Sequence, residues 1–188
     1  PPGIAPAEPA LERRAVRHPP GSALSRPGLR VMGVDPGLVA TGYGCLETRP
    51  GGIAVVDAGV ISTRADERLE ARLQEIHDGV RNLLEKHAPT LLVVEDLYAE
   101  YKFPRTAILM GHARGVIYLA AAEQGVAVLA LAPAEVKRAI TANGAATKAQ
   151  VQRGVQARLG LPEAPRPSHV ADSLSLALIG MSRVLGRL

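Results

Sequence analysis

Three acidic residues and one histidine lie at positions where their chemistry needs a partner. Asp35 and Glu95 each end an apolar run, and Asp172 lies in an otherwise apolar helical segment, three residues after His169. Residues three apart on a helix share a face, so His169 and Asp172 can reach one point. Carboxylates against an apolar core are costly unless a cation neutralises them, and no buried lysine or arginine is an obvious candidate. These four residues predict a divalent metal site.

Oxygen-rich sites of this kind favour Mg²⁺ or Mn²⁺. Two such ions, about 4 Å apart, clamp the attacking and leaving oxygens of a phosphodiester, which is the chemistry of a nuclease. Each residue also has a structural explanation: Asp35 precedes Pro-Gly and can form a turn, Glu95 can cap a turn, and His169 can pack on an amphipathic helix. By spacing alone, both explanations stay open.

The elements that would position these residues alternate between strand and helix patterns. Three β-like segments at 29–35, 43–47 and 53–62 are joined tightly enough for an antiparallel meander. A helical period follows up to Pro89, then a short strand at 91–95, a helix at about 104–124 and a strand at 126–132. Further helices are predicted from Pro133, from Thr147 to Leu159, and from His169 to about Leu185, the last after a stiff connector at 162–168. This is an α/β fold with a mixed five-stranded sheet, three antiparallel strands then two parallel, and helices on both faces, which matches the ribonuclease H-like architecture.

Composition limits the class of protein. The 188 residues suit one domain with an appendage, and the single cysteine, Cys45, excludes an internal disulfide scaffold and fits a reducing compartment. No apolar run reaches the roughly 20 residues of a membrane helix, and no signal-peptide core is visible, so we expect a cytoplasmic protein. Residues 1–28 hold seven of the fifteen prolines and +2 of the net charge of +4. We expect them to be a disordered extension and 29–188 to be the folded domain.

Four blocks of sequence include the candidate site residues. The first is Met32-Gly33-Val34-Asp35-Pro36-Gly37 with Thr41-Gly42-Tyr43-Gly44, and the second is Val93-Val94-Glu95 with Gly111-His112-Ala113-Arg114-Gly115. The third is Pro133-Ala134-Glu135-Val136-Lys137 with Thr147-Lys148-Ala149-Gln150-Val151, and the fourth is His169-Val170-Ala171-Asp172-Ser173-Leu174. Together these blocks resemble the motifs of the RuvC family of Holliday-junction resolvases, in order and with matching separations from about Leu29 to Arg183. The resemblance is therefore more specific than any single motif.

The resemblance implies a homodimeric, metal-dependent endonuclease that nicks two strands of a four-way DNA junction symmetrically during recombination and repair. Position by position, Asp35, Glu95, His169 and Asp172 are its catalytic and metal-binding set, with two Mg²⁺ or Mn²⁺ ions per subunit. The family also implies a branch-migration motor as a partner and action at the nucleoid. Some members have Asp where this chain has His169. A neutral imidazole removes one negative charge and is a softer ligand, so we hypothesise that Mn²⁺ supports activity better than Mg²⁺.

Five residues are candidates for holding DNA. Tyr98, Tyr101 and Lys102 lie in a short aromatic and basic segment after Glu95, where a ring can stack on an unpaired base; the alternative is that these aromatic residues cover the core. Lys137 and Lys148 match family lysines near the scissile phosphate, and the alternative for them is a solvated helix face. Lys148 follows a predicted N-cap, so its ammonium and the helix N-terminus can point at one anion.

The helix at 104–124 is apolar around most of its circumference, which predicts either a dimer contact or a central core helix. Three other functions compete with the resolvase. They are another ribonuclease H-like nuclease acting on branched DNA or RNA–DNA hybrid, a non-catalytic branched-DNA-binding module, and an actin-like phosphate binder. The last needs two lobes that this chain is too short to form, and the presence of all four ligands argues against the second. Only the structure of the preferred substrate separates the two nucleases.

Overall fold

The computed structural model describes residues 28–96 and 104–186. Its elements follow the order predicted from the sequence and are, along the chain, β1 (Arg30–Asp35), β2 (Ala40–Arg49), β3 (Gly52–Ser62), α1 (Leu69–His87), β4 (Leu91–Glu95), α2 (Pro104–Glu123), β5 (Ala127–Leu131), α3 (Pro133–Thr141), α4 (Lys148–Leu159) and α5 (Ser168–Val184). Apart from Gly28, the predicted extension over 1–28 lies outside the described residues and stays a prediction.

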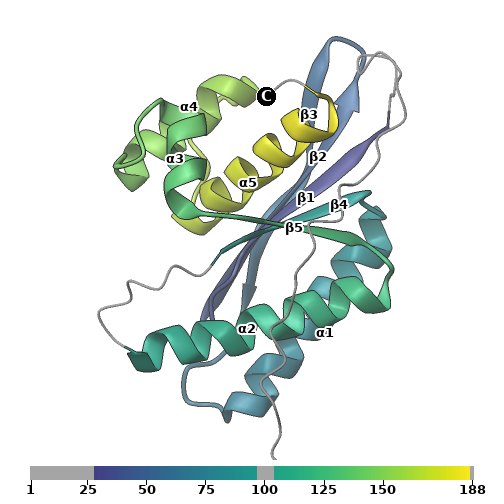
Figure 1. The fold of residues 1–188 in the computed structure, drawn as a ribbon, viewed down its shortest axis with the longest axis vertical. Coiled ribbons are helices and arrows are strands. Elements are labelled where there is room, and N and C mark those ends of the chain that lie inside the picture. Colours follow the sequence, from purple (N-terminus) through teal and green to yellow (C-terminus); the bar gives the residue numbers. More distant parts are fainter. Residues whose placement is uncertain (1–27, 97–103, 187–188) are drawn as a thin grey trace, which may run out of the picture.

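The five strands form one sheet in the order β3-β2-β1-β4-β5. β1, β2 and β3 pair antiparallel, whereas β4 is parallel to β1 and β5 is parallel to β4. Helices α3, α4 and α5 lie on one side of the sheet, and α1 and α2 lie on the other (Figure 1). The predicted ribonuclease H-like architecture is confirmed.

Strand alternation assigns each side chain to one side of the sheet. Val31 in β1 and Val93 in β4 pack in the core under α3, α4 and α5, whereas Met32 and Val94 pack in the core under α1 and α2. Because successive side chains of a strand point to opposite faces, the acids that end β1 and β4 both fall on the α5 side. The alternation of side chains along β1 and β4 thus places the two carboxylates at one edge and on one face of the sheet.

Helix boundaries and strand ends have local causes. Thr147 caps α4 in a capping box with Gln150, as its position predicts, and Pro133 occupies the first turn of α3. β2 is longer than the predicted segment 43–47, because residues 40–42 also pair with the end of β3. The glycine and threonine in this segment do not show the alternating apolar pattern that predicts a strand. In the described part of the chain, no helix is both long and apolar enough to cross a membrane.

Candidate metal centre

Glycines in the sheet let the last helix approach the strand backbone directly. A Cβ added at Gly42 in β2 would lie 2.2 Å from the carbonyl oxygen of His169, and one added at Gly33 in β1 would lie 2.0 Å from that of Ser173. No real Cβ tolerates such distances, so only glycine allows α5 to lie this close. The first turn of α5, with its histidine and its acid, is thereby held against the end of β1.

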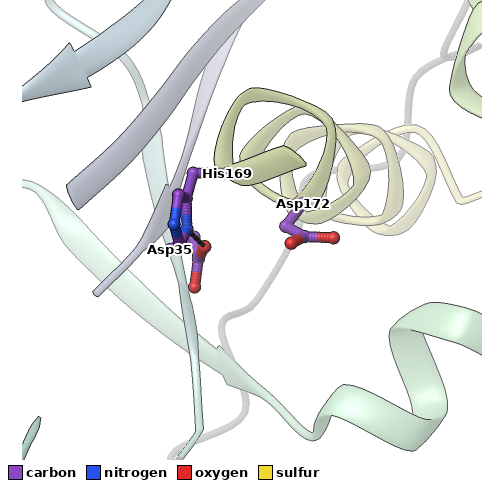
Figure 2. A group of neighbouring side chains, drawn as sticks. All are labelled: Asp35, His169 and Asp172. Atoms are coloured by element: carbon purple, nitrogen blue, oxygen red, sulfur yellow. Dashed lines mark hydrogen bonds and ion pairs between the residues drawn. The ribbon is translucent and has the colours of Figure 1, made fainter. Parts of the chain in front are cut away.

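Asp35, His169 and Asp172 converge at this point. The Nδ1 atom of His169 lies 2.8 Å from an Oδ atom of Asp35. One ligand atom from each of the three residues lies within 4.8 Å of the other two, the one such group of three among the described residues. Figure 2 shows the His169 ring beside the Asp35 carboxylate, with Asp172 projecting from the same helix. If Nδ1 donates to Asp35, the other ring nitrogen remains an acceptor for a cation.

Glu95 lies at the end of the neighbouring strand, outside this group of three but within its electrostatic field. β1 and β4 are parallel, with Val34 opposite Val94, so the acids that follow these valines end adjacent strands. Glu95 interacts unfavourably with the charges of both Asp35 and Asp172. The structure therefore brings all four sequence-predicted ligands to one region.

Burial and mutual repulsion make the charged form of these carboxylates unfavourable. Burial, reinforced by the Asp35 carboxylate, raises the pKa of Glu95 to about 7 and that of Asp172 to about 6. Burial also raises the pKa of Asp35, whereas its hydrogen bond to His169 acts in the opposite direction. Crowded carboxylates of this kind are stabilised by an added cation. The donor set of oxygens plus one imidazole fits a divalent ion.

Two lysines supply positive charge at the rim of the cluster. Lys137 in α3 and Lys148 at the start of α4 both lower the pKa of Glu95 and of Asp172 by their charge. Lys137 is half-buried and Lys148 is exposed, so neither replaces a bound cation inside the cluster. Lys137 and Lys148, two of the three lysines predicted to contact DNA, therefore lie near the acids. Tyr98, Tyr101 and Lys102 lie outside the described residues.

Some residues that shape the site escaped the sequence analysis. Gly42 and Gly33 appeared only as parts of motifs, although small residues at alternate strand positions are a signal of close helix packing. Asp96 directly follows Glu95 and forms an ion pair with Arg114 of α2, with 2.9 Å between Oδ1 and Nη1. Nothing in the sequence indicates that pair, because its members are 18 positions apart in the chain.

Comparison with known proteins agrees with this geometry. Residues 31–180 match the sequence profile of the family described as "Crossover junction endodeoxyribonuclease RuvC". The chain is 44% identical over 158 residues to the crossover junction endodeoxyribonuclease RuvC of Rhodopirellula baltica, covering 83% of this chain and 89% of that protein. It is 45% identical over 148 residues to that of Moorella thermoacetica, covering 79% of this chain and 88% of that protein.

Solved structures give the same result. The structure of Thermus thermophilus RuvC superposes with a TM-score of 0.76 at 34% identity, covering 85% of this chain and 98% of that chain. The same protein in complex with a Holliday junction substrate superposes with a TM-score of 0.74 at 33% identity, covering 85% and 97%. The yeast mitochondrial Holliday junction resolvase Ydc2, at 15% identity and a TM-score of 0.62 over 88% of this chain and 83% of that chain, shares the fold.

Proposed function

The chain belongs to the RuvC family of crossover junction endodeoxyribonucleases, and from this premise we propose that it resolves four-way DNA junctions at a metal site made of Asp35, Glu95, His169 and Asp172. As a member of the family it is a metal-dependent nuclease that hydrolyses phosphodiester bonds in Holliday junctions. The observation that carries the assignment of the site is the convergence of three ligand atoms within 4.8 Å beside the end of β4.

The four ligands have complementary tasks. Asp35 accepts a hydrogen bond from His169 and so fixes the orientation of the ring. Glu95 and Asp172 contribute carboxylate oxygens whose protons must leave before they can bind a cation. When bound, two divalent ions, Mg²⁺ or Mn²⁺, would lower the pKa of a water molecule and stabilise the departing 3′ oxygen. The imidazole favours Mn²⁺ of the two.

Lys137 and Lys148 are suited to bind the phosphate that is cut. Their positive charge acts on Glu95 and Asp172, so a phosphate in contact with those acids would also face these ammonium groups. Lys148 is the first residue of α4, after the N-cap Thr147, and the partial positive charge of a helix N-terminus also favours an anion. From the sequence we further infer that Tyr98, Tyr101 and Lys102 contact DNA beside the site.

A homodimer follows from the exposed side of α2. The helix buries Ala113, Ile117, Ala120 and Ala121 against the rest of the chain, whereas Ile108 and Leu119 are 62% and 52% exposed. These exposed side chains favour a dimer contact over a central core helix, the alternative considered from the sequence.

Five exposed positions between the two ends of α2 form one stripe along the helix, comprising Ile108, His112, Gly115, Leu119 and Ala122. Their spacing alternates between four and three residues, which keeps them on one face. Two large apolar residues, Ile108 and Leu119, with the small residues Gly115 and Ala122 in the same stripe, suit close contact with a second copy. A four-way junction with two equivalent cuts calls for a two-fold dimer. Because its substrate is chromosomal DNA, we also infer that the enzyme works at the nucleoid in the cytoplasm, with a branch-migration motor as partner.

Cleavage of synthetic substrates tests the proposal. A four-way junction with a mobile core is compared with linear duplex and with RNA–DNA hybrid, in Mn²⁺ and in Mg²⁺. We expect paired, symmetric nicks in the junction alone, and their loss in Asp35→Asn. Cleavage of the RNA–DNA hybrid instead would support a metal-dependent nuclease but would contradict the proposal that its substrate is a four-way junction. Tight junction binding without cleavage in either metal would indicate a binding module.

A further inference from the structure

The guanidinium of Arg114 joins α2 to the end of β4. Nη1 lies 2.9 Å from Oδ1 of Asp96, and Nη2 donates a hydrogen bond of 2.7 Å to the Tyr118 hydroxyl. The guanidinium carbon lies 5.1 Å from the centroid of the Tyr118 ring, within the range of a cation–π contact. Only 14% of the Arg114 side chain is exposed. Its planar group is therefore held on several sides, and a group held in this way can fix the position of another residue.

Asp96 is the residue after Glu95, and its backbone continues the strand pairing. The N–H of Asp96 donates to the carbonyl oxygen of Leu131 in β5 over 2.8 Å. In extended backbone, adjacent side chains point to opposite faces. Asp96 thus reaches Arg114 on the side of α2, while Glu95 projects toward α5 and Asp35. Anchoring the first side chain on one face fixes the direction of the second on the other.

We propose that Arg114 is a positioning residue for the metal site: by its ion pair with Asp96 it holds the end of β4 so that Glu95 projects toward Asp35 and Asp172. The inference rests on the proposed role of Glu95 as a ligand. The reason for such an anchor is electrostatic. Glu95, Asp35 and Asp172 repel one another, so a strand end that carries one of these acids would relax away from the others without a restraint on its far side. The ion pair supplies this restraint before any cation is bound.

Manganese binding without DNA provides the first test, because it does not depend on cleavage. We expect Arg114→Ala to weaken Mn²⁺ binding by about tenfold or more, the usual effect of removing a group that orients a ligand. Titration calorimetry or the electron paramagnetic resonance of free Mn²⁺ measures it. Arg81→Ala is the matched control. Arg81 is also a helix arginine that faces a carboxylate, Asp78, at 3.6 Å, and its Nε, like that of Arg114, is buried without a partner in the described part.

Two further variants separate positioning from general destabilisation. Arg114→Lys keeps a positive charge for Asp96 and should recover most of the Mn²⁺ affinity. Asp96→Asn should weaken binding as Arg114→Ala does, and the double variant should be no worse than the more severe single variant, because both changes break one contact. With junction DNA as substrate, the rate constant kcat of Arg114→Ala should fall while its KM changes little.

Three results would overturn the inference: unchanged Mn²⁺ affinity in Arg114→Ala, an equal loss in Arg81→Ala, or a rise in KM alone, which would indicate that Arg114 binds DNA. Thermal unfolding of each variant identifies loss of the fold, in which case Arg114→Lys and Asp96→Asn decide the question. The outcome is distinct from that of the proposed function. If the wild-type protein cuts no junction while Arg114→Ala still weakens Mn²⁺ binding, the resolvase fails and the positioning role stands.

Discussion

At the scale of single residues, the crowding of the acids that would hold a cation destabilises the metal-free fold. Burial and neighbouring carboxylates raise the pKa of Glu95 to about 7, so the folded protein holds a proton that the unfolded chain has already released near neutral pH. Stability of the metal-free protein therefore falls as the pH rises from about 4.5 through 7. At pH 8, Glu95→Gln should raise the free energy of unfolding by about 1–2 kcal/mol. Urea unfolding in the presence of a chelator measures it.

Asp57 provides a control, because its pKa is shifted in the opposite direction to that of Glu95. The hydrogen bond from Lys86 and that with His87 lower the pKa of Asp57, so its contribution to stability is present above its usual pKa and is lost only as the pH falls. Asp57→Asn should destabilise the protein at pH 8. If Glu95→Gln also destabilises the protein at pH 8, the charged Glu95 carboxylate does not destabilise the metal-free fold.

We expect His169 to determine which metal ion supports cleavage better. An imidazole among carboxylates lowers the negative charge of the site and is a softer ligand than oxygen. We expect the wild-type protein to cut junctions faster in saturating Mn²⁺ than in saturating Mg²⁺, and His169→Asp to reduce that difference. Initial rates of junction cleavage in each metal check this, with thermal unfolding to exclude misfolding. Equal wild-type rates in the two metals would contradict the role given to the ring.

We expect Lys148 to contribute more to the rate of cleavage than to the affinity for junction DNA. Its ammonium acts on the acids of the site, so it can stabilise charge that develops on the phosphate during hydrolysis. Lys148→Ala should lower kcat by about 100-fold, comparable to removal of one such donor in other enzymes, while the junction Kd changes by much less. Single-turnover cleavage and a gel-shift titration separate the two. A loss confined to Kd would make Lys148 a contact for DNA only.

At the scale of elements, α5 is positioned by the glycines beneath it. A Cβ at Gly42 would meet the carbonyl oxygen of His169, which is backbone and cannot turn aside. Gly42→Ala should therefore shift the first turn of α5, cost about 1–3 kcal/mol of stability, and lower junction cleavage by about 100-fold, because a displacement of about 1 Å suffices for that. Urea unfolding and single-turnover cleavage measure the two effects.

Gly79→Ala is the comparison for Gly42→Ala. Gly79 lies in α1, where a Cβ would touch only the side chain of Ile61. That side chain can move, and alanine favours a helix, so stability and cleavage should stay near those of the wild-type protein. If Gly42→Ala cuts junctions as well as Gly79→Ala does, close packing at Gly42 does not position His169.

The same elements show what a sequence can and cannot predict. Local patterns were enough for the succession of strands and helices along the chain, the Thr147 cap and the strand ends that carry Asp35 and Glu95, because each depends on neighbours in the chain. The extent of β2 was not predictable, since its first two residues, Ala40 and Thr41, pair with β3 alone. The Asp96–Arg114 pair was also not predictable, because it forms only when α2 packs on the sheet. Contacts between elements can be identified only once the fold is known, whereas the residue pattern of a single helix or strand can be read from the sequence.

At the scale of the whole molecule, the four proposed metal ligands lie in one chain, but a four-way junction has two sites to cut. Asp35, Glu95, His169 and Asp172 all come from a single copy, so loss of a dimer should leave Mn²⁺ binding intact. Leu119, 52% exposed on α2, is the residue whose replacement by arginine should separate the copies without disturbing the core beneath. Val39 is 55% exposed at the turn between β1 and β2, outside α2, which makes Val39→Arg the matched control for oligomeric state.

Sedimentation equilibrium should then show a dimer for the wild-type protein and for Val39→Arg, and a monomer for Leu119→Arg. Because the two cuts of a junction are equivalent only when two sites act together, the monomer should bind Mn²⁺ normally and yet lose paired nicking. A mixed dimer of wild-type and Asp35→Asn chains should nick one strand only, since each chain supplies its own Asp35. A Leu119→Arg protein that stays dimeric would exclude the exposed stripe of α2 as the contact, and paired nicks from a monomer would show that one site cuts both strands in turn.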